Sequence, residues 1–116
     1  MLRQEAEILL KKRFGHDRFY DTQWEVIQRV LRGERVLLIE KTGYGKSLCF
    51  QFPASVFQGI TVVFSPLIAL MRDQVNKLNE LGIPSACINS NQTPEDNQRI
   101  IEHAKRSEIK ILYIAP

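Results

Sequence analysis

The sequence predicts an α/β fold in which a parallel sheet is flanked by helices and preceded by an N-terminal helical segment. From residue 36 onward, short apolar runs alternate with amphipathic stretches at helical spacing. The runs are apolar throughout, as in strands that are buried on both faces. Regular alternation of strands and helices is typical of a parallel sheet with helices on both faces. Residues 1–33 carry two helical patterns and no such run.

The composition is that of an ordinary globular domain. The 116 residues are 44% hydrophobic and 25% charged, with a net charge of +3. These values exclude wholesale disorder, collagen and coiled coil. No apolar run is long enough for a transmembrane helix, and the N-terminus is too polar for a signal peptide. Cys49 and Cys87 are too few for a disulfide scaffold or a four-ligand zinc site, and we expect reduced core thiols.

The first helix is predicted over residues 2–13. Ile8, Leu9 and Leu10 supply its apolar side, and three basic residues follow at 11–13, where a helix C-terminus favours cations. Phe14-Gly15 is expected to end it.

A second helix is predicted to begin near Thr22. Thr22 and Glu25 have the spacing of a capping box, in which each side chain bonds the backbone N–H of the other residue. Gly33 is a suitable stop, because glycine adopts the left-handed cap conformation without strain.

The remaining elements alternate strand and helix. Buried strands are predicted over 36–39, 60–64, 85–89 and 109–114, and helices over 46–56 and 66–81 and from Pro94 onward. Pro66 is assigned to the first turn of the middle helix, where its missing N–H costs nothing, and Thr93 is assigned as the cap of the last. The inner face of the middle helix is predicted to comprise Leu67, Leu70, Met71, Gln74, Val75, Leu78 and Leu81.

The strongest chemical signal is the run Thr42-Gly-Tyr-Gly-Lys-Ser47 between a predicted strand and a helix. Glycines allow a sharp turn whose N–H groups face a phosphate, and the following helix N-terminus adds further donors. Lys46 can reach the β- and γ-phosphates, and Ser47 can bind Mg²⁺. The run therefore predicts a nucleoside triphosphate site. Glu40 stands where the general pattern has its first glycine, and the alternative is a plain glycine-rich turn before a helix.

Four segments in order resemble RecQ-type DNA helicases of superfamily 2, over about residues 10–116. They are Phe14–Gln23, Thr42–Ala54, Ser65–Val75, and Asn89–Thr93 followed by Leu112–Pro116. The resemblance implies a partial RecA-like P-loop domain. It also implies ATP and Mg²⁺ as cofactors, and 3′-to-5′ translocation on single-stranded or partly duplex DNA. DNA repair and recombination, and a cytoplasmic, nucleoid-associated or nuclear location, are expected with it.

The resemblance also implies roles for single residues. The residues implied to bind the adenine base are His16, Tyr20 and Gln23. Those implied to bind the phosphates are Thr42, Gly43, Tyr44, Gly45, Lys46 and Ser47. Those implied to bind DNA are Ser65, Pro66, Leu67, Arg72, Gln92 and Thr93. Lys46 and Ser47 are the expected catalytic residues, and Ser47 the expected metal ligand. A side-chain amide matches the N6 and N7 edge of adenine, so Gln23 would select the base.

Several positions depart from the family pattern. His16 and Tyr20 stand where the family usually has tyrosine and arginine, Lys41 replaces a proline, and Tyr44 replaces a small residue. Two rings can still stack on a purine. The alternative for His16 and Tyr20 is that they are surface residues of a loop. The alternative for Gln23 is a first-turn residue of a capped helix, and the alternative for Arg72 is a solvated surface residue.

The acidic residues needed for hydrolysis are not found. After the phosphate loop the acidic residues are Asp73, Glu80, Glu95, Asp96, Glu102 and Glu108, and none follows a predicted strand. The family's acidic box and its second RecA-like domain would lie beyond Pro116. We therefore expect residues 1–33 to form a helical segment with the adenine motif, and residues 34–116 a truncated ATP-binding domain. Such a fragment would be inactive and only marginally stable, with open strand edges.

Three functions are consistent with these residues. The first is the N-terminal part of an ATP-dependent helicase, whose partners would be DNA and the remaining helicase domains. The second is a truncated nucleotide- or DNA-binding module without enzymatic activity. The third is an unrelated P-loop kinase, which would need an arginine-rich lid that the sequence does not show. ATP hydrolysis stimulated by single-stranded DNA separates the first function from the second.

Overall fold

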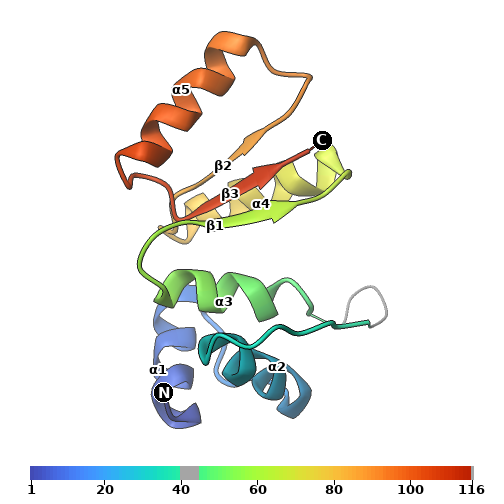
Figure 1. Cartoon of the computed structure of the whole chain (residues 1–116). Helices are drawn as coiled ribbons and strands as arrows, with labels where there is room; N and C mark the ends of the chain where they lie inside the picture. The colour runs from blue at the N-terminus through green and yellow to red at the C-terminus, as the bar shows by residue number, and fades with distance from the viewer. Residues whose placement is uncertain (40–44, 116) are drawn as a thin grey trace. The chain divides into compact units, whose positions relative to one another are not determined.

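The computed structural model describes residues 1–39 and 45–115 and divides the chain into two compact units, Met1–Val56 and Phe57–Pro116 (Figure 1). We call them the N-terminal and C-terminal units. The first contains helices and the second contains a parallel sheet with helices, so the predicted α/β class is confirmed. Within the described residues, no helix is both long and apolar enough to cross a membrane.

The N-terminal unit consists of helices α1 (Arg3–Phe14), α2 (Asp21–Leu31) and α3 (Leu48–Val56). Helix α1 confirms the prediction, with basic residues in its last turn. Gly15 ends it in the left-handed region at φ 79°, and its N–H donates to the carbonyls of Leu10 and Lys11, both at 3.1 Å. These bonds satisfy carbonyl groups that the last turn of a helix leaves without a partner.

Four aromatic rings form the centre of the N-terminal unit. Phe52 on α3 is fully buried, and its ring lies edge-on to Phe19 at 5.0 Å and tilted against Phe14 at 6.2 Å. Phe19 also stacks on Trp24, with 5.7 Å between ring centroids. The rings come from all three helices and from the loop before α2, so this cluster holds the unit together.

Helix α2 begins next to the predicted start near Thr22, but its capping box lies two residues before the predicted one. The helix begins at Asp21, and the carboxamide of Gln23, rather than the carboxylate of Glu25, accepts the N–H of Tyr20 at 2.8 Å. The predicted pairing of Thr22 with Glu25 therefore does not cap the helix. Glutamine and glutamate both carry an acceptor oxygen that suits the third helical position, and because the cap is Tyr20 rather than Thr22, Gln23 takes the role predicted for Glu25. The end near Gly33, at φ 84°, is confirmed.

The predicted strand over residues 36–39 is wrong. These residues form neither strand nor helix, and the side chains of Leu37 and Ile39 are 84% and 82% exposed. An extended segment becomes a strand only when a neighbour pairs with its N–H and C=O groups, and no described segment pairs with this one. The helix that follows, α3, begins at Leu48, two residues later than predicted.

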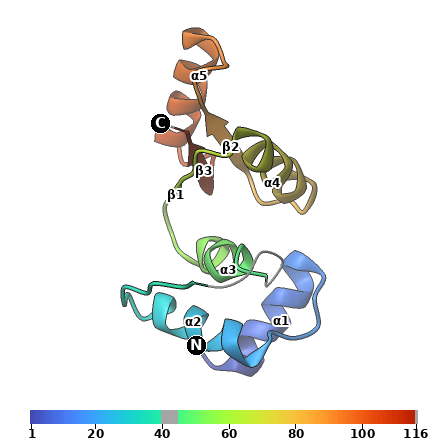
Figure 2. The same ribbon diagram turned by 90° about the vertical axis from the view of Figure 1, so that its right-hand side faces the viewer.

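The C-terminal unit contains β1 (Thr61–Phe64), α4 (Ile68–Glu80), β2 (Ser85–Ile88), α5 (Pro94–Lys105) and β3 (Ile111–Ile114). All strand pairs are parallel and the strand order is β1-β3-β2. Helices α4 and α5 lie on opposite sides of the sheet (Figure 2). Thr93 caps α5 as predicted, because its hydroxyl accepts the N–H of Asp96 at 3.1 Å.

Helix α4 presents a narrower apolar face to the sheet than predicted. Met71, Val75 and Leu78 are buried, and the hydroxyl of buried Tyr113 on β3 donates to Oε1 of Gln74 at 2.7 Å. The outer members of the predicted face are exposed, namely Leu67, Leu70 and Leu81. Helix α4 begins at Ile68, so Leu67 precedes it, and Pro66 lies before the helix rather than in its first turn.

Strand β1 is only half covered, although its sequence predicts burial on both faces. Val62 and Phe64 are 43% and 72% exposed, while the intervening side chains are half-buried. Strand β1 lies at an edge of the sheet, and α5 packs against β2 at the opposite edge. An apolar run therefore predicts a strand here, but it does not reveal which neighbours cover it.

Candidate functional site

The glycine-rich run is described in its second half only. Gly45, Lys46 and Ser47 lie in the described residues, whereas Thr42, Gly43 and Tyr44 lie outside them. The half-buried Lys46 and Ser47 come directly before α3, and their carbonyls accept the first N–H groups of that helix. The structure thus places the lysine and the hydroxyl at a helix N-terminus, as the sequence predicts. The partial positive charge of that terminus favours an anion.

The residues predicted to bind the base line one cavity. His16, Tyr20 and Gln23 share a cavity of about 410 Å³ with Gly45 and Leu48, whose wall also includes Asp17 and Arg18. The volume lies within the usual range for small-molecule sites. The cavity joins the loop before α2 to the residues before α3. It therefore connects the two motifs, which are far apart in the sequence.

Gln23 connects the two sides of this cavity. Gln23 is buried, with 5% of its surface exposed. Its Oε1 accepts the N–H of Tyr20 at 2.8 Å, and its Nε2 donates to the carbonyl of Gly45 at 3.3 Å. An amide has two N–H donors and two acceptor lone pairs, so these bonds use half of its capacity. Gln23 therefore caps α2 and also contacts Gly45 of the glycine-rich run.

Gly45 occupies a position that requires glycine. Its φ is +86°, in the left-handed region that side chains rarely adopt, and a Cβ there would lie 2.6 Å from Nε2 of Gln23. The absence of a side chain lets the amide of Gln23 reach the backbone of the loop. The sequence motif identifies this glycine, but it does not reveal the contact with Gln23.

The residues predicted to bind DNA gather at the carboxyl edge of the sheet. Ser65 follows β1 and Gln92 follows β2, and in parallel strands these ends meet at one edge. The N–H of Ser65 donates to the carbonyl of Ile114, and the Ser65 hydroxyl accepts the N–H of Leu67 at 3.2 Å. Pro66 and Leu67 are exposed beside it, as is Arg72 on the first half of α4.

Gln92 and Thr93 are already engaged within the unit. Nε2 of Gln92 donates to the carbonyl of Cys87 at 2.9 Å and to Oδ1 of Asn97 at 2.7 Å. Asn97 in turn donates to the carbonyl of buried Asn89, and Thr93 caps α5. The side chains of Gln92 and Thr93 thus shape the loop after β2. The sequence analysis missed Asn89 and Asn97, for which the only signal is polarity beside a strand end.

Both thiols favour the protonated form. Burial raises the pKa of the Cys49 thiol. Burial also raises the pKa of the Cys87 thiol, and the positive charge of Arg72 opposes that change. Both cysteines are free, as predicted. The electrostatic effect of Arg72 on Cys87 places its charge near the carboxyl end of β2.

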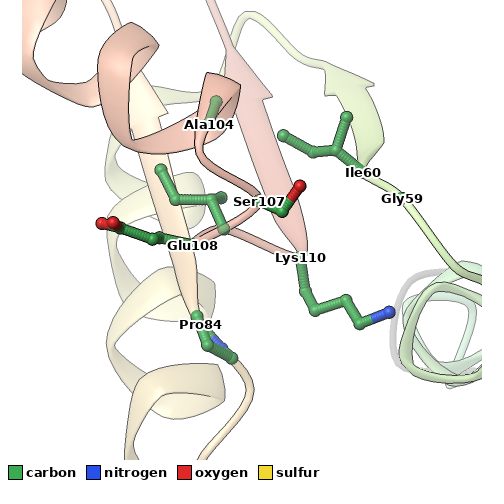
Figure 3. A pocket seen from close by; sticks show the side chains of 8 residues that line it. Gly59, Ile60, Pro84, Ala104, Ser107, Glu108 and Lys110 are labelled. Carbon is green, nitrogen blue, oxygen red and sulfur yellow. The ribbon is translucent and has the colours of Figure 1, made fainter.

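A second cavity lies at the opposite, amino edge of the sheet. It has a volume of about 290 Å³ and is lined by Gly59, Ile60, Pro84, Ser107 and Lys110, among others (Figure 3). Nζ of Lys110 donates to the carbonyl of Phe57. None of the residues predicted to bind nucleotide or DNA lines this cavity, so we do not include it in the candidate site.

Comparison with known proteins shows which proteins the chain is similar to. Residues 20–116 match the DEAD/DEAH box helicase family. The chain is 44% identical over 108 residues to the ATP-dependent DNA helicase RecQ of Haemophilus influenzae, covering 93% of this chain and 17% of that protein. It is 39% identical to the RecQ helicase of Synechocystis, covering 98% of this chain and 24% of that protein. It is 42% identical to the RecQ helicase of Bacillus subtilis, covering 96% of this chain and 19% of that protein. The chain thus spans about a fifth of the length of these relatives.

Proposed function

Because this chain belongs to the DEAD/DEAH box helicase family and is similar to the N-terminal part of RecQ helicases, we propose that it is the ATP-binding part of a 3′-to-5′ DNA helicase. The observation that carries the proposal is the cavity that brings His16, Tyr20 and Gln23 beside Gly45. The whole protein would act in DNA repair and recombination, in the cytoplasm at the nucleoid or in the nucleus. Its second RecA-like domain and later domains would complete the enzyme.

In this proposal the cavity holds the adenine base. The exposed rings of His16 and Tyr20 supply flat apolar surface for stacking. Gln23 has one further N–H and one further lone pair to offer an adenine edge, besides the bonds to Tyr20 and Gly45. A base with the opposite donor and acceptor pattern, such as guanine, is then disfavoured because it leaves buried polar groups without partners.

The phosphates would lie at the N-terminus of α3. Lys46 would bind the β- and γ-phosphates, and the Ser47 hydroxyl would hold Mg²⁺, since hard oxygen donors suit that ion. Thr42, Gly43 and Tyr44 would complete the loop. When bound, Mg²⁺ neutralises charge on the β- and γ-oxygens.

ATP turnover is not expected from the chain alone. The residues that directly follow the described strands are Ser65, Asn89 and Ala115, so none of these strands ends in a carboxylate. Phosphoryl transfer to water needs an acidic residue there to order the metal and water. This observation also favours a second candidate, a binding module that acts without hydrolysis.

We expect the 116-residue chain to bind Mg²⁺-ATP more tightly than Mg²⁺-GTP, without hydrolysis stimulated by single-stranded DNA. Isothermal titration measures the two affinities, and phosphate release measures turnover. Lys46→Ala is the matched control, because it removes the phosphate-binding cation and sets the background of contaminating ATPase. Equal affinity for ATP and GTP would contradict the adenine site. Turnover above the Lys46→Ala background would contradict the proposed inactivity.

Single-stranded DNA would bind along the carboxyl edge of the sheet. Arg72 offers the cation, and Ser65, Pro66 and Leu67 offer the adjoining surface. Because Gln92 and Thr93 are engaged in the loop after β2, we propose that they act on DNA by shaping that loop.

Arg72→Ala is expected to weaken binding of an oligonucleotide uniformly across sequences. It should also reduce the slope of log K against log salt by about 0.7, the value for one phosphate contact on a single strand. Fluorescence anisotropy over a salt series measures both quantities. Lys77→Ala, at the other end of α4, is the control and should leave the slope unchanged. If the two variants change the slope equally, the effect is one of general charge and the assignment of Arg72 is wrong.

A further inference from the structure

Helix α1 holds the backbone on which the base-binding residues sit. It lies outside the residues matched by the helicase family, and no motif in it points to a ligand. Two of its side chains nevertheless reach the loop before α2. Nη2 of Arg3 donates to the carbonyl of Phe19 at 2.8 Å, and Oε2 of Glu7 accepts the N–H of Phe19 at 2.9 Å.

The peptide group that joins Phe19 to Tyr20 is therefore fixed at both ends. Its carbonyl accepts from Arg3, and its N–H donates to Gln23. Arg3 also donates through Nη1 to Asp21, the first residue of α2, at 2.8 Å. A planar guanidinium can bond two acceptors at once in a fixed geometry, which an ammonium group cannot. Helix α1 thus binds the backbone of Phe19 before Tyr20 and the side chain of Asp21 after it.

The bonds from Arg3 and Glu7 to Phe19 are charge-assisted and partly buried. Glu7 is 19% exposed and Arg3 is 33% exposed, and Nε of Arg3 lies 3.5 Å from the Glu7 carboxylate. Each charge orients the other, and together they hold a donor and an acceptor of the backbone. Hydrogen bonds with one charged partner are stronger than neutral ones. Phe19 itself is 3% exposed within the aromatic cluster, so its peptide has little freedom to move.

We propose that Arg3 and Glu7 are positioning residues of the nucleotide site, which orient Tyr20 and Gln23 toward the base. The inference rests on the proposed function, because it assigns these two residues to the base part of that same site. Neither side chain lines the cavity, so they act through the backbone of Phe19 and Tyr20. The bonds described above from Arg3 and Glu7 end at Phe19 and Asp21, so the phosphate end of the site, at Lys46 and Ser47, should be unaffected.

The test compares ATP with inorganic triphosphate, which has the phosphates but no base. Arg3→Ala should weaken Mg²⁺-ATP binding by about tenfold, the size of one lost charge-assisted hydrogen bond. The affinity for Mg²⁺-triphosphate should stay within about twofold, since the phosphate contacts remain. Arg29→Ala is the matched control: Arg29 also has two carboxylate partners, Glu25 and Glu34, but holds no part of the Phe19–Tyr20 backbone. It should change neither affinity.

Two milder variants keep the test decisive if Arg3→Ala does not fold. Arg3→Lys keeps the charge but replaces the planar guanidinium fork by a single ammonium nitrogen, and Glu7→Gln keeps an acceptor but loses the charge. Both should lower the ratio of ATP to triphosphate affinity, while fluorescence of Trp24 reports an intact fold. If a variant loses affinity for ATP and triphosphate equally, or if the ratio of the two affinities is unchanged, the role assigned to Arg3 and Glu7 is wrong. The proposed function would not be affected by that result. A wild-type chain that binds triphosphate as tightly as ATP would overturn both the inference and the proposed base site.

Discussion

Gly45→Ala is expected to abolish the preference for ATP over GTP and to destabilise the N-terminal unit. Two costs add at this position. A side chain at φ +86° costs about 1–2 kcal/mol, because the left-handed region is strained for residues with a Cβ. In addition, the new Cβ would lie 2.6 Å from Nε2 of Gln23, so that amide must leave the carbonyl of Gly45. The side chain proposed to select adenine would then be displaced.

Gly33→Ala separates these two costs. Gly33 has almost the same φ, +84°, in the same unit, but a Cβ there has no atom within 4 Å. It should show the conformational cost alone and keep the ATP preference. Urea unfolding followed by Trp24 fluorescence gives the free energy of unfolding, and titration with ATP and GTP gives the preference. If both variants lose stability and selectivity equally, the contact between Gln23 and Gly45 has no role in base selection.

Phe52→Ala is expected to unfold most of the N-terminal unit at 25 °C. Phe52 is fully buried and contacts the rings of Phe14 and Phe19. Replacing a buried phenylalanine by alanine costs about 3–5 kcal/mol through lost burial and the remaining cavity. Typical stabilities of about 0.05–0.15 kcal/mol per residue give roughly 3–8 kcal/mol for a unit of this length. The loss is therefore comparable to the whole stability of the unit.

The single tryptophan makes this loss measurable. Trp24 stacks on Phe19, which in turn contacts Phe52, so its fluorescence should report the disrupted cluster. Phe64→Ala is the control, because Phe64 is 72% exposed in the other unit and its loss should change Trp24 little. A Phe52→Ala variant with a native tryptophan spectrum and a cooperative transition near that of wild type would contradict the assigned role of the cluster.

Local sequence signals predicted the elements whose ends are determined by nearby residues. Gly15 and Gly33 end helices as expected, and the Thr93-Pro94 pair begins α5. The structure also brings the predicted base-binding residues His16, Tyr20 and Gln23 to one cavity, and their contact with a base stays a prediction. In these cases the determining contacts lie within a few residues along the chain or follow from a known motif.

Features that depend on distant neighbours could not be predicted. Residues 36–39 have the composition of a buried strand, but a strand needs a partner that composition does not supply. Phe64 is apolar yet exposed, because β1 lies at a sheet edge. The role of Gln92 was missed for a similar reason, since Asn97 and the Cys87 carbonyl become its partners only when α5 packs beside β2.

The strand order has a consequence for the time course of folding during synthesis. Among the described strands, β3 comes last in the sequence and is the central one, and β1 and β2 each pair with it rather than with each other. Thr61 of β1 and Ser85 of β2 both pair with Ile111 of β3. The sheet therefore cannot form on the ribosome until β3 has emerged. Strand pairs between residues far apart in the sequence form slowly. Until they form, apolar residues such as Val62 and Phe64 are exposed and can bind chaperones or aggregate.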